Sequence, residues 1–295
     1  MSIKINSPIK YFGGKSYLAK QICALFPPPE QYHNFIELFS GGASVLFAHE
    51  PVNCAEYLND LNGEIENFWR VLREPDLFAG FVRIVQATPF SEATFRLAQD
   101  RVLPYGCNPI TRAVRFFVLN RLSRSGGFQT FATLTRNRTR RGIAEQASAW
   151  LGAVEGLPDV HARLAGVVLL KRPALAVIDV LDADKGESLF YADPPYWGVQ
   201  RAGAGEYENT PGGSGCEMLL EDHIALLDKL AKIRGKFLLS GYHSDLYDDY
   251  AREYGWNCTE FSAPLASAGG DTKRIATECV WRNYGVNNGM PCKDG

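Results

Sequence analysis

Several patterns that would place this 295-residue chain in a familiar class are missing from it. Its seven cysteines are scattered without a Cys-x-x-Cys pair, and its five histidines show no metal-ligand spacing. We therefore expect reduced thiols, no disulfide framework and no metal. A run of about 18 apolar residues is absent, as is a signal-like apolar stretch over residues 1–10. These absences predict a cytoplasmic protein that does not contact a membrane.

Two nucleotide-binding patterns are also missing. The Gly-x-Gly-x-x-Gly fingerprint of dinucleotide-binding enzymes is absent, which makes a dehydrogenase a distant alternative. The segment 10–16, Lys-Tyr-Phe-Gly-Gly-Lys-Ser, ends like a P-loop, but Ile9 stands where that motif needs glycine. We therefore exclude nucleoside triphosphate binding at this loop.

Acidic residues are absent from one long window. Residues 101–144 contain nine arginines and no Asp, Glu or Lys, whereas the whole chain carries a net charge of −2. The remainder therefore carries −11, and this segregation favours a polyanion-binding face on an otherwise acidic protein. The alternative is a helix whose arginines pair with acids elsewhere in the chain.

The spacing of apolar residues divides the chain into three regions. The first predicts strands over 34–38 and 54–58 and helices over 43–49 and 63–72, a βαβα start. The middle predicts a helix over 110–122 and a hairpin strand over 128–135. The last predicts strands over 188–192 and 236–240, a helix over 221–233, and a closing antiparallel pair over 256–262 and 277–284. The fold class is therefore α/β with a mostly parallel, Rossmann-like sheet, formed by residues 1–74 and 165–295. Residues 75–164 are predicted to be an inserted, mainly helical domain with a β-hairpin.

The segment Ala192-Asp193-Pro194-Pro195-Tyr196-Trp197 directly follows a predicted strand, at the sheet edge where ligands bind in doubly wound folds. Two prolines fix φ and remove two backbone donors, so the loop stays rigid and presents carbonyls outward. Asp193 and the Pro194 carbonyl can then accept both N–H groups of an exocyclic amine, while Tyr196 stacks on its ring. Accepting these bonds moves the amine nitrogen toward tetrahedral geometry and frees its lone pair. A proline-rich turn without such a role is the alternative.

A glycine turn follows another predicted strand, in the segment 35–43, Phe-Ile-Glu-Leu-Phe-Ser-Gly-Gly-Ala. A strand, a glycine turn and a helix N-terminus bring backbone close to a ligand. Asp60 ends the next strand, where an acidic side chain can bind ribose hydroxyls. A Rossmann-like turn of unrelated function is the alternative.

Taken in order, these segments resemble a known family. Lys-Tyr-Phe-Gly-Gly-Lys at 10–15, Glu-Leu-Phe-Ser-Gly-Gly at 37–42, Asn-Asp-Leu-Asn at 59–62, a basic segment and Asp-Pro-Pro-Tyr at 193–196 are similar to Dam-like DNA adenine methyltransferases of the D12 class, α-group. Asn120-Arg121 before Gly126-Gly127, Ser240-Gly241-Tyr242 and Glu278-Cys279-Val280-Trp281 are also similar. The resemblance spans nearly the whole chain, and the ordered set is more specific than any one motif.

The resemblance implies a class I methyltransferase fold, S-adenosylmethionine as methyl donor and a target-recognition domain in the insertion. The reaction it implies is methyl transfer to adenine N6 in double-stranded DNA after base flipping, without a covalent intermediate. By motif position, the residues expected to bind the cofactor are Tyr11, Lys15, Glu37, Phe39, Gly41, Gly42, Asp60 and Asp193. Asp193, Pro194 and Tyr196 are expected to serve the target base. The predicted DNA contacts are Lys10, Asn120, Arg121, Arg124, Arg136, Arg138, Arg140 and Arg141.

This chain departs from its relatives at two places. Ala43 ends the glycine turn where many relatives carry glycine, a change that we expect to be tolerated. Pro173 lies where relatives often carry an Asp that reaches the cofactor adenine, and Asp179 or Asp182 is a candidate substitute. The alternative functions are methylation of the cytosine amine or of RNA, and a DNA-binding relative without catalysis. A leading Asp193, where cytosine enzymes more often have Ser, favours adenine. A cognate restriction enzyme is a candidate partner.

Overall fold

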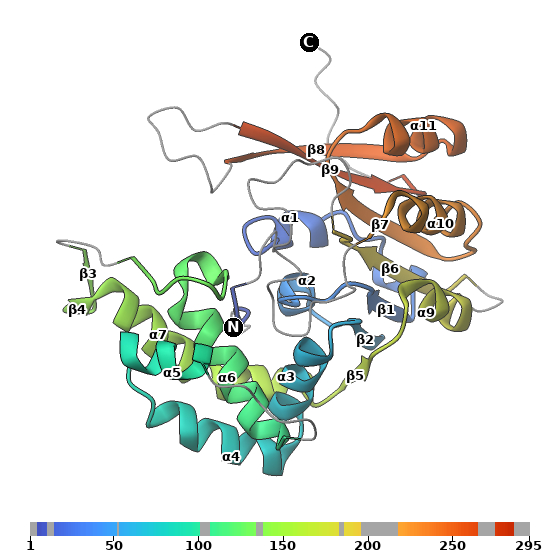
Figure 1. The fold of residues 1–295 in the computed structure, drawn as a ribbon. Helices are drawn as coiled ribbons and strands as arrows, with labels where there is room; N and C mark the ends of the chain where they lie inside the picture. Colours follow the sequence, from blue (N-terminus) through green and yellow to red (C-terminus); the bar gives the residue numbers. More distant parts are fainter. Residues whose placement is uncertain are drawn as a thin grey trace.

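A computed structural model describes residues 5–10, 15–51, 53–100, 107–133, 138–182, 186–195, 218–264 and 275–285 of the chain. Its centre is a seven-stranded sheet in the order β5-β2-β1-β6-β7-β9-β8 (Figure 1). The strands are β1 Asn34–Glu37, β2 Ala55–Asn59, β5 Val167–Leu170, β6 Ser188–Ala192, β7 Lys236–Gly241, β8 Asn257–Pro264 and β9 Ile275–Arg282. The five strands from β5 to β7 are parallel, whereas β9 runs antiparallel to both β7 and β8. The predicted α/β class with a closing antiparallel pair is confirmed.

The parallel strands form where the sequence predicts them, because each is a short apolar run that packs on both faces of the sheet. Every residue of β6 is buried, and Phe35 and Ile36 of β1 are fully buried. The register places Glu37 beside Leu58 on one side and Tyr191 on the other, so the carboxyl ends of β1, β2 and β6 lie together. This edge collects the residues that follow each strand.

Helices cover the sheet on both faces. They are α1 Ala19–Cys23, α2 Ser44–Ala48, α3 Gly63–Arg73, α9 Ala174–Leu181, α10 Leu220–Leu230 and α11 Asp245–Tyr254, and a short turn η1 spans Pro29–Gln31. Helix α3 begins at Asn62, whose side chain accepts hydrogen bonds from the N–H groups of Glu64 and Ile65 and so caps the first turn. The chain therefore turns sharply after Asp60 into a fixed helix.

The middle segment is mainly helical, as predicted. It contains α4 Pro75–Gln86, α5 Glu92–Asp100, α6 Pro109–Leu122, η2 Arg124–Gly126, the hairpin β3 Thr139–Arg140 with β4 Ile143–Ala144, α7 Glu145–Glu155 and α8 Leu157–Leu164. Phe68 of α3 packs against Phe81 of α4 and stacks on Phe117 of α6. The helical segment thus shares one hydrophobic core with α3 and with the sheet face beneath it.

The hairpin was predicted at the wrong place. Among residues 128–133, the structure has only an isolated bridge between Ser123 and Phe131. Phe128 adopts a left-handed φ of 62°, and its N–H donates to the Ser123 hydroxyl, which interrupts an extended strand. The paired strands come later, at β3 and β4. Residues 134 and 135 lie outside the described part of the chain.

In the part of the chain that the structure describes, no helix is long and apolar enough to cross a membrane.

Candidate active site

A buried lysine joins three segments that are far apart in the sequence. The Lys15 ammonium lies 2.8 Å from Asp193 Oδ1 and 3.2 Å from Glu278 Oε1. Lys15 is 3% exposed and Glu278 1%, whereas the Asp193 side chain is 18% exposed. Burial alone lowers the pKa of Lys15, but the two carboxylates outweigh it and raise that pKa. The predicted site residues Lys15 and Asp193 therefore meet at the sheet edge.

Glu278 is a site residue that the sequence analysis did not assign. It lies in β9, and its second oxygen accepts a hydrogen bond from the Tyr17 hydroxyl over 3.3 Å. An acid within an otherwise apolar strand is a detectable signal, since a charged residue is rarely fully buried unless it is paired. Its partner could not be inferred from the sequence, because Lys15 lies 263 positions away.

The glycine turn between β1 and α2 is held by Asp60. One carboxylate oxygen of Asp60 accepts the Gly41 N–H over 2.8 Å, and the other accepts the Asn62 N–H over 2.9 Å. Burial raises the pKa of Asp60, while these backbone donors oppose the rise. The Trp69 indole donates to the Gly41 carbonyl over 3.2 Å. Asp60 and the predicted cofactor loop are therefore in direct contact.

Within this turn, Gly41 has a φ of 43° and Ala43 a φ of 50°. Both angles lie in the left-handed region, which is costly for a residue that carries a Cβ. Ala43 therefore carries a Cβ at a position where the backbone conformation favours glycine. Phe39 is half-buried, and Gly42 is buried in the same turn.

Glu37 is 3% exposed and accepts the Leu46 N–H over 3.0 Å, at the start of α2. Burial raises its pKa to about 8, although the backbone N–H groups of Leu46 and Val45 oppose the change and the nearby charge of Asp193 adds to it. The Lys15 ammonium thus has two carboxylates beside it, those of Asp193 and Glu278, and Glu37 is close enough to Asp193 to feel its charge. This end of the sheet favours a cationic ligand.

Two candidate substitutes for the acid missing at Pro173 are engaged elsewhere. Asp179 pairs with Lys229, and Asp182 accepts the N–H groups of Arg234 and Gly235. Neither is placed to reach a ligand at the turn after β5. That turn is instead held by Asn59, whose side-chain amide exchanges two hydrogen bonds with the backbone of Arg172.

Asn120 and Gly126 hold the N-terminal segment in place. The Asn120 side chain is fully buried, accepts the Lys10 N–H over 2.8 Å and donates to the Lys10 carbonyl over 2.5 Å. A Cβ on Gly126 would lie 2.5 Å from the same carbonyl, and its φ is 79°. The Asn-Arg and Gly-Gly motifs thus clamp Lys10. Burial, together with the positive charge of Arg121, lowers the pKa of Lys10 to about 8.

The structure divides the predicted DNA contacts into two groups. Asn120 is enclosed, and Arg121 donates to the Ala149 carbonyl over 2.7 Å, with its Nε buried. Burial lowers the pKa of Arg121 to about 10. These two side chains therefore support the fold and do not form an open surface. Lys10 remains half-buried beside them.

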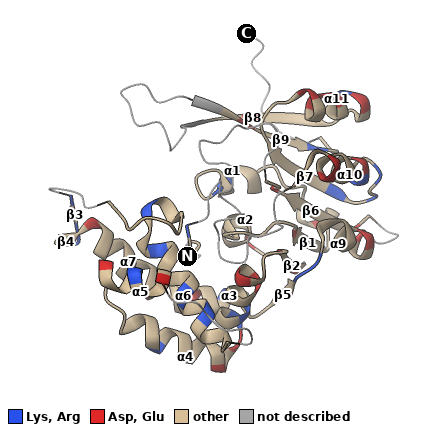
Figure 2. Cartoon of the chain, in the orientation of Figure 1, with Lys and Arg blue, Asp and Glu red and all other residues tan. Residues whose placement is uncertain are grey.

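The exposed group consists of arginines around the hairpin. Arg138 is 73% exposed, with Glu145 at 4.0 Å, and Arg141 forms a two-point pair with Glu155 over 2.8 and 2.9 Å. Arg124 and Arg140 are exposed. Figure 2 shows Lys and Arg along the helical segment, and Asp and Glu gathered on α10 and α11. Arg136 lies outside the described residues, as do Tyr11 and Tyr196.

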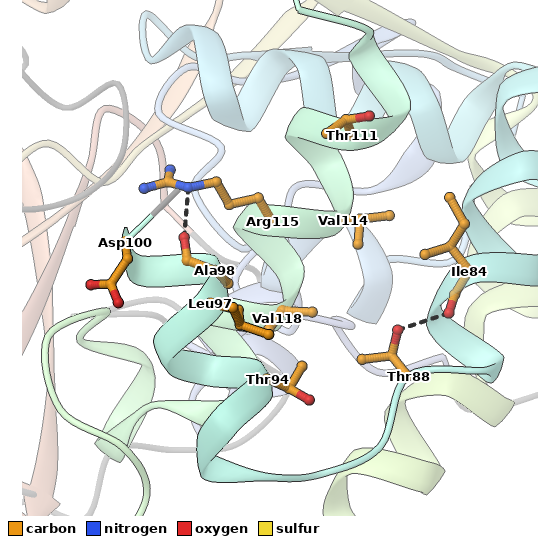
Figure 3. Close-up of a pocket in the computed structure, with 10 residues that line it drawn as sticks. All are labelled: Ile84, Thr88, Thr94, Leu97, Ala98, Asp100, Thr111, Val114, Arg115 and Val118. Carbon is orange, nitrogen blue, oxygen red and sulfur yellow. Dashed lines mark hydrogen bonds between the residues drawn. The ribbon is translucent and has the colours of Figure 1, made fainter. Parts of the chain in front are cut away.

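A separate cavity of about 590 Å³ lies among α4, α5 and α6 (Figure 3). Its lining is mostly apolar, and Arg115 is tied there by a hydrogen bond to the Ala98 carbonyl over 2.8 Å. None of the residues predicted for the cofactor or the base lines this cavity. Of the arginine window, Arg115 and Arg112, the latter paired with Glu64 at 2.6 Å, serve packing between helices.

Comparison with known proteins agrees with the motifs. Residues 11–129 match the family model of the D12 class N6 adenine-specific DNA methyltransferases. This part of the chain is therefore similar to the D12 class. The match covers the glycine turn, Asp60 and the Asn120–Gly126 clamp, and it ends before Asp193. The mixed α/β fold with its mostly parallel sheet is consistent with a methyltransferase.

One curated relative is Modification methylase StsI from Streptococcus sanguinis, which is 40% identical over 67 residues. The similarity covers 22% of this chain and 10% of the length of that relative. Both similarities agree with the family that the sequence motifs predicted.

Proposed function

We propose that this protein transfers a methyl group from S-adenosylmethionine to the N6 amine of adenine in double-stranded DNA. The observation that carries the proposal is the Lys15 bridge between Asp193 and Glu278, at the edge where the Asp60-bound glycine turn also lies. It joins the motif expected to serve the base to the segment expected to serve the cofactor. The family of residues 11–129 supports the same reaction.

The charge of the site fits S-adenosylmethionine, which supplies an electrophilic methyl group on a positively charged sulfonium. The carboxylates of Asp193 and Glu278 outnumber the single ammonium of Lys15, which favours a cation in this region. Gly41 brings backbone close to a ligand, and Asp60 fixes that backbone. In this proposal Lys15, Asp60 and Asp193 act on the cofactor, Glu37 to Gly42 form its loop, and Tyr11 completes the set.

Asp193 follows β6 directly and orients the target amine. Lys15 contacts Oδ1 of Asp193, and a carboxylate offers about four acceptor positions, so an amine N–H can be accepted as well. The Pro194 carbonyl takes the second N–H, and Tyr196 stacks on the base. A duplex hides this amine, so the base must leave the stack at a cost of about a few kcal/mol.

The target-recognition role falls to residues 75–164, with DNA contacts at Arg124, Arg138, Arg140 and Arg141 in the described part and at Arg136. Exposure of Arg138 beside the hairpin supports this assignment, because a phosphate can compete for an arginine whose acid lies 4.0 Å away. Asn120 and Arg121 are not proposed as direct contacts, because the Asn120 amide holds the Lys10 backbone and Arg121 donates to the Ala149 carbonyl. StsI is a modification methylase, and similarity to it supports a cognate restriction enzyme as partner. A cytoplasmic location belongs to the same proposal.

The test is to incubate methylation-free duplex DNA with the protein and S-adenosylmethionine and to map every modified base by sequencing. We expect N6-methyladenine at one short sequence. Methylation of cytosine amines, of RNA only, or of nothing would each contradict the proposed substrate.

The role of Asp193 is tested with the variant Asp193→Ala in a radiolabel transfer assay. We expect activity to be lost while the protein stays folded, because this partly exposed side chain supplies an acceptor rather than core volume. The matched control is Asp249→Asn, an exposed acid on α11 paired with Arg252. Activity of Asp193→Ala within tenfold of wild type, a barrier change of about 1.4 kcal/mol, would contradict the role.

A further inference from the structure

Strand pairing brings two scattered cysteines together on the sheet face opposite Glu278. In the β8–β9 ladder Cys258 faces Trp281, and Glu260 faces Cys279. Because alternate residues of a strand share a face, Cys258, Glu260 and Cys279 project on the same side. Cys279 is fully buried, whereas Cys258 is exposed.

A histidine from a third segment reaches the same point. His243 lies in the turn between β7 and α11, and β7 pairs with β9 so that Gly241 faces Cys279. One nitrogen of His243, one sulfur of Cys258 and one sulfur of Cys279 all lie within 4.8 Å of one another. His243 Nε2 is also 3.3 Å from Glu260 Oε1. Three possible ligand atoms, one nitrogen and two sulfurs, therefore lie together, and the Glu260 carboxylate lies beside the histidine.

The other nitrogen of His243 is already fixed. Its Nδ1 lies 2.8 Å from one oxygen of Asp248 and 3.0 Å from the other, and its ring packs edge-on against Trp281. A carboxylate on one imidazole nitrogen is the usual arrangement when the other nitrogen binds a metal, because it sets the tautomer and the ring orientation. Here Asp248 holds Nδ1, which leaves Nε2, 3.3 Å from Glu260 Oε1, as the ligand atom.

We propose that His243, Cys258, Cys279 and Glu260 form a tetrahedral site for Zn²⁺. Ligands of this kind bind zinc at about 2.0–2.3 Å, which places neighbouring donor atoms about 3.3–3.8 Å apart, so the cluster contracts slightly on binding. Both thiols release their protons, and the two thiolates with the Glu260 carboxylate exceed the charge of the ion by one. The bound ion joins β8, β9 and the turn after β7.

The state of the thiols is compatible with this role. The Cys279 thiol donates a hydrogen bond to the Cys258 sulfur, so the two sulfurs already share one proton. A metal ion would take the place of the shared proton. Because the site lies on the opposite face from Glu278, its test is separate from that of methyl transfer.

A second cluster provides the matched control. His49, Cys54 and Glu56 also place ligand atoms within 4.8 Å of one another. There, however, the Arg163 guanidinium already binds both oxygens of Glu56, at 2.5 and 2.6 Å, and Tyr32 contacts His49 Nε2 at 3.0 Å. A fixed cation occupies the position that a metal would need, so this cluster is not proposed as a site.

The experiment is an anaerobic titration of reduced, chelator-treated full-length protein with Co²⁺, followed by absorption spectroscopy. We expect one equivalent to bind with visible bands of tetrahedral cobalt and a near-ultraviolet sulfur-to-cobalt band, and Zn²⁺ to displace both. Cys258→Ser should halve the near-ultraviolet band, because one of two thiolates is lost. His243→Gln should weaken binding, and Cys54→Ser should change neither measurement.

The expected spectra establish the site, and three other results would overturn it. The first is the absence of tetrahedral cobalt bands, and the second is a near-ultraviolet band that Cys258→Ser leaves unchanged. The third is that two titratable thiols are lost in air and recovered with reductant, while the reduced protein still shows no cobalt bands. That result would mean that Cys258 and Cys279 form a disulfide instead of a metal site. Cys258 and His243 are exposed, so we expect both variants to fold, and circular dichroism checks this. If either variant fails to fold, Glu260→Gln replaces it in the titration.

Discussion

Replacing Lys15 with methionine tests whether its ammonium holds the site together. Lys15→Met keeps most of the side-chain volume but leaves two carboxylates without their cation, at 2.8 and 3.2 Å. Glu278 is 1% exposed and cannot regain water, whereas Asp193, at 18%, can do so in part. Breaking a buried ion pair by removing one partner costs about 3–5 kcal/mol, so we expect a loss in that range.

The loss should depend on the remaining charge. In Lys15→Met combined with Glu278→Gln, the most deeply buried carboxylate is replaced by a neutral amide. The double variant should therefore lose about 0.5–3 kcal/mol less stability than the sum of the two single losses. The raised pKa of Lys15 means that its stabilisation is complete below its ordinary pKa of 10.5 and is lost only as the pH rises through the higher folded value. Wild-type stability from this source should therefore be constant across neutral pH.

The measurement is urea-induced unfolding, followed by fluorescence and circular dichroism, for both single variants, the double variant and wild type. Lys20→Met is the matched control, because Lys20 lies exposed on α1. A loss for Lys15→Met within about 0.5 kcal/mol of this control would refute the reasoning, as would strictly additive losses in the cycle.

Three further predictions concern the turn, its buried acid and the hairpin. Ala43→Gly should raise the free energy of unfolding by up to about 1 kcal/mol, because φ is 50° there, and urea unfolding measures it. Between its ordinary pKa of 4.5 and about 8, Glu37 is protonated in the folded chain. The free energy of unfolding of the wild type should therefore fall by a few kcal/mol as the pH rises through that window. Unfolding of Glu37→Gln, measured at several pH values, should show a smaller fall. Arg138→Ala should reduce the slope of log K against log [salt] for duplex DNA by about one unit, whereas Arg112→Ala, at a residue paired with Glu64, should leave it unchanged.

Each of these has a contrary outcome. A destabilised Ala43→Gly would mean that the extra chain entropy of glycine outweighs the relieved strain. A pH dependence that Glu37→Gln leaves intact would assign it to another group. Equal salt slopes for wild type and Arg138→Ala would identify the hairpin arginine as a solvated residue.

The parallel strands were predictable because they are short apolar runs bounded by turn residues, and β6 was predicted with its observed ends. The Asp60 contact with the glycine turn was predictable as well, since both follow neighbouring parallel strands. Glu278 was not assigned because its role depends on pairing between β7 and β9, a contact that residue spacing does not reveal. The pairing of 256–262 with 277–284 was predicted, but its register was not, so the approach of Cys258 to Cys279 was missed.

The arginine window shows where composition misleads. Counting charges treats all nine arginines alike, but Arg121 is enclosed against the Ala149 carbonyl and Arg112 is paired with Glu64. The pairing interpretation therefore holds for these two residues, and the polyanion-binding interpretation stays a prediction for the exposed arginines. Asn120 was expected to contact DNA, but packing turned its amide onto the backbone of Lys10.

The long sequence separation between Lys15 and its partners determines when the site can form during protein synthesis. Its two partners lie 178 and 263 positions later in the chain. At about 5–20 residues per second, the ribosome needs roughly 13–53 s after Lys15 to add Glu278. Nascent chains can form β1, β2 and the turn that Asp60 holds well before that moment, but the triad closes only when β9 joins the sheet. The residues of the glycine turn are therefore synthesised early, whereas the ion pairs of Lys15 form among the last steps of folding.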